Sequence, residues 1–256
     1  MSMENRTTYV LWTGGWDSTF RMLQLAVEKH KGDTIQPIYV IGDNRPSEAR
    51  EIETMASILP ELRSRSQAEL EDVLLIDKAS IPEDARISAA FAAIRQELVI
   101  GTQYEYLARL TKEYPFLEIG IEKPNGEYSG CVAAIQRMGA MIERDGSYFL
   151  DPERSSESCV LLFGGFSFPL FNTTETGMVR WVQENGGQEI MRKIWFCHHP
   201  LHGEPCGICR PCQQKMECEM AWLLPSAGQK RYRAMKRVQL LLGEELGQKA
   251  AKRIYY

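Results

Sequence analysis

Residues 9–26 read Y-V-L-W-T-G-G-W-D-S-T-F-R-M-L-Q-L-A, and this stretch is the most informative about the fold. An apolar run at residues 9–12 precedes the polar loop T-G-G-W-D-S-T at residues 13–19, and apolar residues at helical spacing follow. The pattern predicts a buried strand, a tight loop and the start of a helix. Adjacent glycines let the backbone come close to an anion, and the free amides of a helix N-terminus attract negative charge. We therefore predict a phosphate-binding loop here.

The same alternation of strands and helices continues to residue 121. Further buried strands are predicted at residues 37–41, 72–76 and 117–121. The helices predicted between them are residues 20–30, a stretch that begins after the N-cap candidate Ser47, and a long stretch from about residue 83 to residue 112. The second of these helices is expected to bury one face, made of Ile52, Met55, Ala56 and Leu59. Elements in this order predict an α/β fold with a doubly wound parallel sheet.

The second half of the chain is less regular. Residues 125–165 are interpreted as an insertion with short strands at 148–150 and 159–163. Thr174 is the N-cap candidate of a helix that runs to about residue 183. The basic amphipathic stretch at residues 230–246 is interpreted as the solvated face of a helix, with contact to RNA or to an acidic partner left open. These patterns divide the chain into an α/β domain at residues 1–192, a cysteine loop at 193–220 and a helical tail at 221–256.

The composition is that of an ordinary globular protein. The chain has 256 residues, 44% of them hydrophobic and 25% charged, which suffices for one α/β core with a small appendage. A net charge of −4 argues against nucleic-acid binding through overall charge. No apolar run approaches the roughly 18 residues of a membrane span, and residues 1–8 lack a signal-peptide core. We expect a cytoplasmic protein whose seven cysteines are thiols or metal ligands rather than disulfides.

Four cysteines near the C-terminus have the spacing C-x8-C-x2-C-x2-C: Cys197, Cys206, Cys209 and Cys212. Four thiolates complete a tetrahedral Zn²⁺ site, and the turn-forming linkers between them suit such a loop. A [4Fe–4S] cluster remains an alternative, because closely spaced C-x2-C pairs also ligate iron. Cys218 is interpreted as a buried helical residue. Three histidines in the long linker are interpreted as surface or substrate-facing residues rather than ligands: His198, His199 and His202.

The loop at residues 13–19 resembles the S-G-G-x-D-S signature of the PP-loop ATP pyrophosphatases, with Thr13 in the place of the first serine. It matches neither a Walker A loop nor a dinucleotide-binding fingerprint. The resemblance implies a PP-loop, adenine-nucleotide α-hydrolase-like fold in which the loop holds the β- and γ-phosphates of ATP while a substrate group attacks the α-phosphate. By position, Asp17 would brace the loop or bind Mg²⁺ and act in catalysis together with Ser18. The resemblance further assigns ATP binding to Trp12, Thr13, Gly14, Gly15, Asp17, Ser18, Thr19, the backbone of Val40 and, as a cation for phosphate, Arg95.

The two motifs in this order resemble the 7-cyano-7-deazaguanine synthase (QueC) family. The resemblance also covers segments at residues 47–57, 127–130, 168–171 and 195–199. It implies that ATP activates the carboxylate of 7-carboxy-7-deazaguanine, that ammonia or another amine forms a carbon–nitrogen bond, and that a second ATP-driven step gives the nitrile used for queuosine. It also implies a structural Zn²⁺ on the four cysteines, and it makes Glu122 and Tyr128 candidates for substrate binding.

The chain departs from that family at two places. Residues 131–138 read C-V-A-A-I-Q-R-M, a helical pattern, where the family has a substrate-binding segment. Glu175 stands where the family has a lysine, so that this cation is absent or supplied by another residue such as Arg180. Three functions therefore stay open: the nitrile synthase; a QueC-like ligase of a bacterial anti-phage defence cluster that joins the acyl group to an amine on a protein or another acceptor; and a non-catalytic nucleotide-binding partner. A homodimer is also left open.

Overall fold

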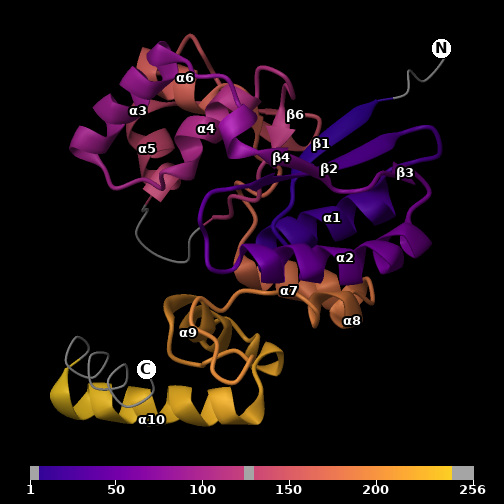
Figure 1. The fold of residues 1–256 in the computed structure, drawn as a ribbon, viewed down its shortest axis with the longest axis vertical. Helices are drawn as coiled ribbons and strands as arrows, with labels where there is room; N and C mark the ends of the chain where they lie inside the picture. The colour runs from indigo at the N-terminus through magenta and orange to yellow at the C-terminus, as the bar shows by residue number, and fades with distance from the viewer. Residues whose placement is uncertain (1–5, 124–129, 244–256) are drawn as a thin grey trace. The chain divides into compact units, whose positions relative to one another are not determined.

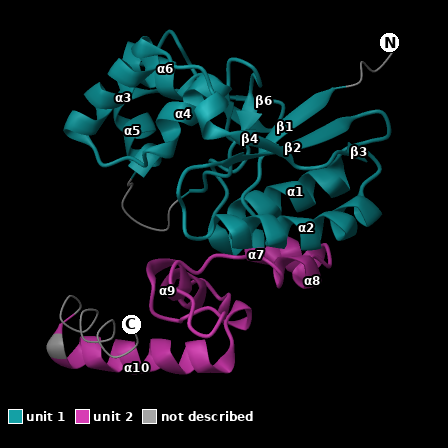
Figure 2. Cartoon of the chain, viewed as in Figure 1, with its two compact units in different colours: residues 1–178 teal, residues 179–256 magenta. Residues whose placement is uncertain are grey.

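The computed structural model describes residues 6–123 and 130–243, which are drawn in colour in Figure 1. The chain forms two compact units, residues 1–178 and residues 179–256, hereafter unit 1 and unit 2 (Figure 2). Within the described ranges, no helix has both the length and the apolar character needed to cross a membrane.

Unit 1 is built on a six-stranded parallel sheet. Its strands are β1 (Thr7–Leu11), β2 (Thr34–Ile41), β3 (Glu69–Leu70), β4 (Leu74–Asp77), β5 (Leu117–Glu118) and β8 (Phe166–Ser167). The order is β3-β2-β1-β5-β8. Strand β4 pairs with the second half of β2, after the residues of β2 that pair with β3. The predicted α/β class with a parallel central sheet is confirmed. Because the chain passes from β1 to β2 on one side and reaches β5 on the other, the carboxyl ends of these strands form a switch point of the kind where ligands bind in α/β folds.

Helices α1 (Trp16–Glu28) and α2 (Glu48–Arg65) lie side by side beneath the strands (Figure 1). The predicted apolar face of α2 is partly wrong, because Ala56 is exposed and Ile52 is only half-buried. The buried face instead includes the polar residue Glu51, which accepts a hydrogen bond from the hydroxyl of Tyr39 at 2.7 Å. The buried residues are Glu51, Thr54, Met55, Ile58, Leu59 and Leu62.

The long helix predicted at residues 83–112 is wrong, because two helices occupy this stretch: α3 (Ala85–Glu97) and α4 (Gln103–Leu110). Asp84 caps α3 by accepting hydrogen bonds from the amides of Arg86 and Ile87. The helix ends at Leu98, whose backbone is extended (φ −138°, ψ 145°). The residues that follow, V-I-G, combine two β-branched side chains with a glycine, all weak helix formers.

The insertion contains α5 (Gly130–Met138), the hairpin β6 (Met141–Arg144) and β7 (Ser147–Leu150), and α6 (Glu157–Phe163). The helical pattern at residues 131–138 and the strand at 148–150 are confirmed. The strand predicted at 159–163 is wrong, because this run is helical and Ser156 caps it through the amide of Cys159 at 3.3 Å. Its buried residues Cys159, Leu162 and Phe163 are three and four positions apart, which is helical rather than alternating spacing. Helices α3, α4, α5 and α6 gather in one group (Figure 1).

Helix α7 (Glu175–Glu184) begins in unit 1 and ends in unit 2, and the hydroxyl of Thr174 caps it through the amide of Gly177 at 3.1 Å, as predicted. Unit 2 continues with α8 (Gln188–Met191), α9 (Arg210–Glu217) and α10 (Ser226–Leu242). The predicted basic C-terminal helix is therefore present as far as the described residues reach. Cys218 corrects a prediction, because it is the half-buried C-cap residue of α9 and not a buried helical residue.

Candidate functional site

A cavity of about 270 Å³ opens in unit 1 at the carboxyl ends of β1, β2 and β5. Its walls come from the loop after β1, from the end of β2 with the loop that follows, from α4, and from residues 119–121 beyond β5. This is the switch point of the sheet. A concave site there with convergent polar groups is the first candidate for ligand binding.

The glycine loop of residues 13–19 forms one wall of this cavity. Gly15 is the N-cap residue of α1, so the amides of the first turn of that helix point toward the cavity side of the loop. The Ser18 hydroxyl accepts a hydrogen bond from the Thr13 amide at 3.1 Å and lies 3.1 Å from the Thr13 hydroxyl. Thr13, Gly15, Asp17 and Ser18 all line the cavity. Four of the predicted phosphate-loop residues are thereby brought together.

The other three predicted loop residues are buried behind the cavity wall. The indole of Trp12 donates to the hydroxyl of Thr19 at 2.9 Å, and both side chains are fully buried. Gly14 has a φ of +68°, and a Cβ there would lie 3.1 Å from Cγ2 of Thr54 and 3.3 Å from the carbonyl oxygen of Glu51 in α2. The cavity is therefore not lined by Trp12, Gly14 or Thr19, which support the loop through buried contacts.

The loop after β2 supplies the positive charge of the cavity. Arg45 is the one cationic side chain among the described residues that line it, and a third of this side chain is exposed. Its Nη2 donates to the hydroxyl of Tyr39 at 2.8 Å, and its Nη1 lies 3.2 Å from Oε2 of Glu51. Burial, followed by the hydrogen bond to Glu51, raises the pKa of Tyr39 well above its usual value. Tyr39 therefore stays protonated and holds the guanidinium in place.

Asp43 lies on the same loop and is fixed from two sides. It forms an ion pair with Lys78 and accepts a hydrogen bond from the hydroxyl of Tyr106 at 3.1 Å. Burial, and then the charge of Asp43, raises the pKa of Tyr106, so this phenol is a donor at neutral pH. Val40, at the end of β2, lines the cavity between these groups and the glycine loop. The adenine-contact position that the resemblance implies is thus part of the same cavity wall.

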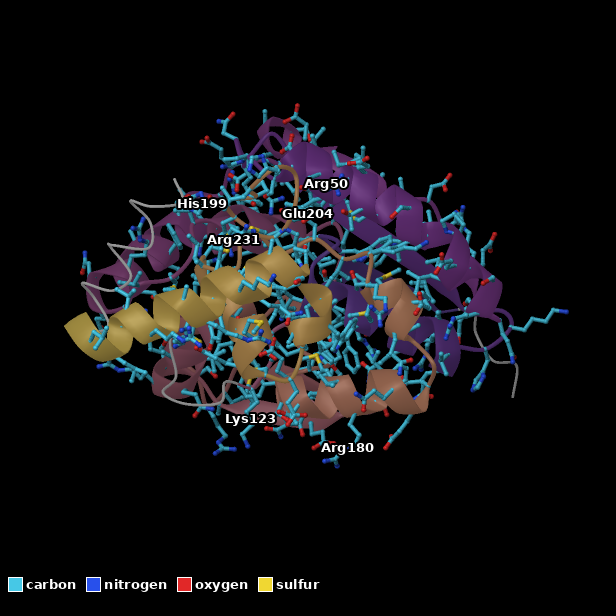
Figure 3. The ribbon with its side chains drawn as sticks, turned by 90° about the horizontal axis from the view of Figure 1, so that it is seen from below. Arg50, Lys123, Arg180, His199, Glu204 and Arg231 are labelled. Atoms are coloured by element: carbon cyan, nitrogen blue, oxygen red, sulfur yellow. The ribbon has the colours of Figure 1, made fainter. Side chains whose placement is uncertain are left out.

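Three other candidates do not line the cavity. Arg95 is exposed on α3, with its guanidinium 5.5 Å from the ring centre of Phe91. Glu122 is half-buried next to the cavity residue Ile121, and the exposed Lys123 follows it (Figure 3). Arg180 is exposed on α7, in unit 2 (Figure 3). Tyr128 lies outside the described residues.

Sequence reasoning missed several residues of the cavity. Arg45 and Asp43 could have been found, because they directly follow a buried parallel strand, and the carboxyl ends of such strands are where ligand groups gather. Tyr104 and Tyr106 come from α4 and look like core residues in the sequence. Tyr104 also donates from its hydroxyl to Sγ of Cys131 in α5 at 2.9 Å. Burial raises the pKa of Tyr104 and of the Cys131 thiol.

The four cysteines of unit 2 form a second candidate site. Cys197, Cys206, Cys209 and Cys212 are buried, and their sulfur atoms all lie within 4.8 Å of one another. The two sulfur pairs, Cys197 with Cys209 and Cys206 with Cys212, are each 3.8 Å apart. Four sulfurs bound to a single ion at about 2.3 Å in a tetrahedron are about 3.8 Å apart. The cluster can therefore hold one metal ion such as zinc, whereas a four-iron cube would spread the sulfurs further because each binds a different iron.

Backbone amides also point at these sulfurs. The amide of Cys206 donates to Sγ of Cys197 at 3.2 Å, and the amides of Ile208 and Cys209 donate to Sγ of Cys206 at 3.3 Å. Such bonds stabilise thiolates and orient metal ligands. The hydrogen bond with Cys197 lowers the pKa of Cys209, whereas hydrogen bonds among the neighbouring sulfurs raise the pKa of Cys197 and of Cys212. All four sulfurs can therefore be thiolates together only when a cation is bound among them.

The metal loop and α10 fit closely within unit 2. Gly207 has a φ of +83°, and a Cβ there would lie 2.0 Å from the carbonyl oxygen of Gly228 in α10. Arg231, labelled in Figure 3, donates from Nε to the carbonyl oxygen of Cys206 at 2.7 Å. The histidines of the long linker are exposed, as expected: His198, His199 and His202. Cysteines alone make up the cluster found among the described residues.

No family model matches the chain, and no curated protein is significantly similar to it. What the two sites can do is therefore inferred from their own residues, together with the motif resemblance given above.

Proposed function

We propose that unit 1 binds ATP in the cavity at the switch point and uses it to activate a carboxylate by adenylation. One observation carries the proposal: a glycine loop at the N-terminus of α1 and the cation of Arg45 line the same small cavity. Backbone amides and an arginine are the groups that bind phosphate oxygens. The S-G-G-x-D-S resemblance supports ATP as the nucleotide.

Residues of this cavity can be matched to the phosphates and adenine of ATP and to Mg²⁺. The loop amides after Gly15 and the Ser18 hydroxyl would hold the phosphates, and the backbone of Val40 would meet the adenine. The carboxylate of Asp17, in the first turn of α1, is an oxygen ligand of the kind that Mg²⁺ prefers. The cradle is also a close fit, since a Cβ on Gly120 would lie 3.1 Å from Cβ of Asp17 and 3.2 Å from the Ser18 amide nitrogen. When bound, Mg²⁺ spreads the charge of the leaving pyrophosphate.

The proposed reaction has two balanced steps. A carboxylate oxygen of the substrate forms a bond to the α-phosphorus, and the bond from that phosphorus to the bridging oxygen breaks, so pyrophosphate leaves with the electron pair. An amine nitrogen then attacks the acyl carbon, AMP leaves, and the nitrogen loses a proton. Arg45 and the loop amides stabilise the developing charge in the first step. No nucleophilic side chain is needed, because most of the acceleration comes from holding the two reactants together.

We propose 7-carboxy-7-deazaguanine as the acid, on the strength of the QueC-like order of motifs. In that reading the enzyme is an ATP-dependent ligase that forms carbon–nitrogen bonds, and Zn²⁺ on the four cysteines has a structural role. The acceptor is either ammonia, which leads to an amide and then the nitrile, or an amine on a protein or another molecule. Helix α5 favours the second acceptor, because it occupies the sequence position of the family's substrate segment. Glu175, buried at the start of α7, instead favours the non-catalytic nucleotide-binding partner, since a carboxylate replaces the family's lysine.

Mass spectrometry of a reaction with ATP, 7-carboxy-7-deazaguanine and ammonia tests the proposal. AMP and pyrophosphate with the free amide or nitrile would identify ammonia as the acceptor. AMP and pyrophosphate that form only with a protein or amine added, together with its acylated product, would identify the defence-type ligase. Binding of ATP without pyrophosphate under every condition would leave the non-catalytic partner as the remaining function.

Asp17→Asn is the informative variant, because it keeps the size of the side chain and removes its charge. We expect pyrophosphate release to be abolished in it. Asp72→Asn is the matched control, since the side chain of Asp72 is 88% exposed and lines neither cavity of unit 1. Turnover of Asp17→Asn at the rate of this control would refute the role of the loop.

A further inference from the structure

Unit 1 contains a second and larger cavity, of about 700 Å³, that the proposed reaction does not use. It lies at the opposite edge of the sheet, at the amino ends of β1 and β5. Its other walls are Lys29 just after α1, the β6–β7 hairpin, and the end of α6. The two cavities share no lining residue, although β1 contributes residues to both: Thr7, Thr8 and Tyr9 line the second cavity, and Leu11 lines the first. The second cavity is therefore a distinct candidate site, and its volume lies within the usual range of small-molecule sites.

An aromatic pair forms the apolar part of this cavity. The rings of Phe116 and Phe149 meet edge to face, with their centres 5.7 Å apart. Phe116 has a φ of +57°, a left-handed conformation that is unfavourable for a bulky residue, and it is 62% exposed. Such strain persists only where the surrounding structure imposes it, and it is found most often at functional sites. The backbone here presents a large aromatic surface to the cavity, and that surface suits the apolar body of a ligand.

Three cations surround the same cavity: Arg6, Lys29 and Arg144. Among the described residues, none of the three side chains forms an ion pair or a hydrogen bond with a protein group. Two acids also line the cavity. Glu118 is buried and already neutralised, because Arg21 donates to its two oxygens at 2.7 and 3.0 Å, and Asp145 is exposed at the hairpin turn. The charge left to meet a ligand is positive, in a chain whose net charge is −4.

We propose that this cavity binds an organic anion in which a carboxylate is attached to an aromatic body. The carboxylate would meet Arg144, Lys29 and Arg6, and the aromatic body would cover the exposed ring of Phe116. A neutral ligand of the same shape would lack the charge interaction, and a cationic one would be repelled. A nucleic-acid backbone is disfavoured, because half of the wall is aromatic or aliphatic rather than basic. The proposed site rests on its own lining residues and does not depend on the reaction proposed for the first cavity.

Three probes of nearly the same shape and different charge test this proposal: 3-phenylpropanoate, 3-phenylpropanamide and 3-phenylpropylamine. Binding is followed by two-dimensional NMR of the isotope-labelled full chain, with the affinity taken from the shift of the amides of Phe116, Phe149 and Arg144. We expect the propanoate to bind at these residues about threefold or more tightly than the amide, and the amine not to bind, because exposed ion pairs have modest strength. Equal binding of propanoate and amide, or shifts confined to the first cavity, or no shift with any probe, would overturn the proposal.

Variants separate the contribution of charge from that of the ring. Arg144→Glu should weaken propanoate binding about threefold or more and leave amide binding unchanged, while Lys31→Glu should change neither. Lys31 is an exposed lysine near the end of α1 that does not line the cavity, so it carries the same change of charge elsewhere. Phe116→Ala should weaken both probes, because it removes the aromatic surface. A loss of affinity in Lys31→Glu as large as in Arg144→Glu would mean that only the overall charge matters, and would contradict the site.

Discussion

Gly14→Ala tests how closely the phosphate loop is held against α2. Two effects add in this variant. A residue with a side chain at a φ of +68° is destabilised by about 1–2 kcal/mol relative to glycine. The new methyl group would also lie 3.1 Å from Cγ2 of Thr54, 3.3 Å from the carbonyl oxygen of Glu51 and 3.4 Å from Cγ of Met55. These distances are shorter than the 3.5–4.0 Å or so at which carbon atoms attract each other.

The neighbours of this methyl group cannot move aside easily. Thr54 and Met55 are 6% and 1% exposed, and the carbonyl of Glu51 belongs to the backbone of α2. Overpacking of this kind costs about 1–3 kcal/mol. The free energy of unfolding should therefore fall by about 2–5 kcal/mol in total, from the sum of both effects. Because the loop must shift to relieve the contact, ATP binding should weaken as well.

Gly146→Ala is the matched control for this measurement. Gly146 lies in the turn between β6 and β7 with a φ of +75°, and a Cβ there would meet nothing within 4 Å. It carries the conformational effect without the contact, so we expect a loss of only about 1–2 kcal/mol. Urea unfolding followed by circular dichroism gives both values. Equal destabilisation of the two variants, within about 0.5 kcal/mol, would refute the tight packing of the loop on α2.

Three further predictions concern charge, metal and pH. Arg45→Met should weaken ATP binding about tenfold, which corresponds to about 1.4 kcal/mol. Arg50→Met should leave the affinity unchanged, because Arg50 forms an exposed ion pair with Glu53 on α2. Both affinities are measured by calorimetric titration, and equal affinities in the two variants would show that Arg45 does not bind ATP. Metal analysis should find one zinc ion per chain. Cys209→Ser should lose this zinc and Cys218→Ser should keep it, because the sulfur of Cys209 belongs to the cluster and that of Cys218 does not. Retention of zinc in Cys209→Ser would contradict the assignment. The pKa of Tyr39 is raised in the folded state, so the unfolded state loses this proton first and stability should decline as the pH rises above about 10. In Tyr39→Phe the decline, measured by urea unfolding at a series of alkaline pH values, should be shallower, and an unchanged slope would show that Tyr39 does not contribute.

The parts of the fold that sequence could predict are those fixed by local chemistry. The strand–glycine loop–helix unit at residues 9–26 is such a part, since its apolar run, glycines and helical spacing act within a few residues of each other. The same holds for the cysteine spacing and for the Thr174 cap. Where a short apolar run could form either a strand or a helix, as at residues 159–163, periodicity alone could not decide, and the Ser156 cap made it helical.

The candidate site was harder to predict, because it depends on what the sheet order brings together. Arg45 lies about 30 residues after the glycine loop, and Tyr104 and Tyr106 lie about 60 residues further on; only the pairing of β1 with both β2 and β5 places them around one cavity. Arg95 shows the converse. A charged residue on a predicted helix suited a phosphate site, but the break between α3 and α4 at Leu98 separates its helix from the one that lines the cavity.

Activation of the acid as an adenylate can be followed by the transfer of an oxygen isotope from the acid to AMP. The protein is incubated with ATP, Mg²⁺, an amine such as ammonia, and 7-carboxy-7-deazaguanine labelled with oxygen-18 in its carboxylate. The mass of the nucleotide product is then measured by mass spectrometry. We expect AMP that carries one labelled oxygen, because the oxygen that attacked the α-phosphorus stays on it when the amine displaces AMP. Unlabelled AMP would contradict adenylation. So would unlabelled ADP formed together with labelled inorganic phosphate, because that pair of products indicates an acyl phosphate.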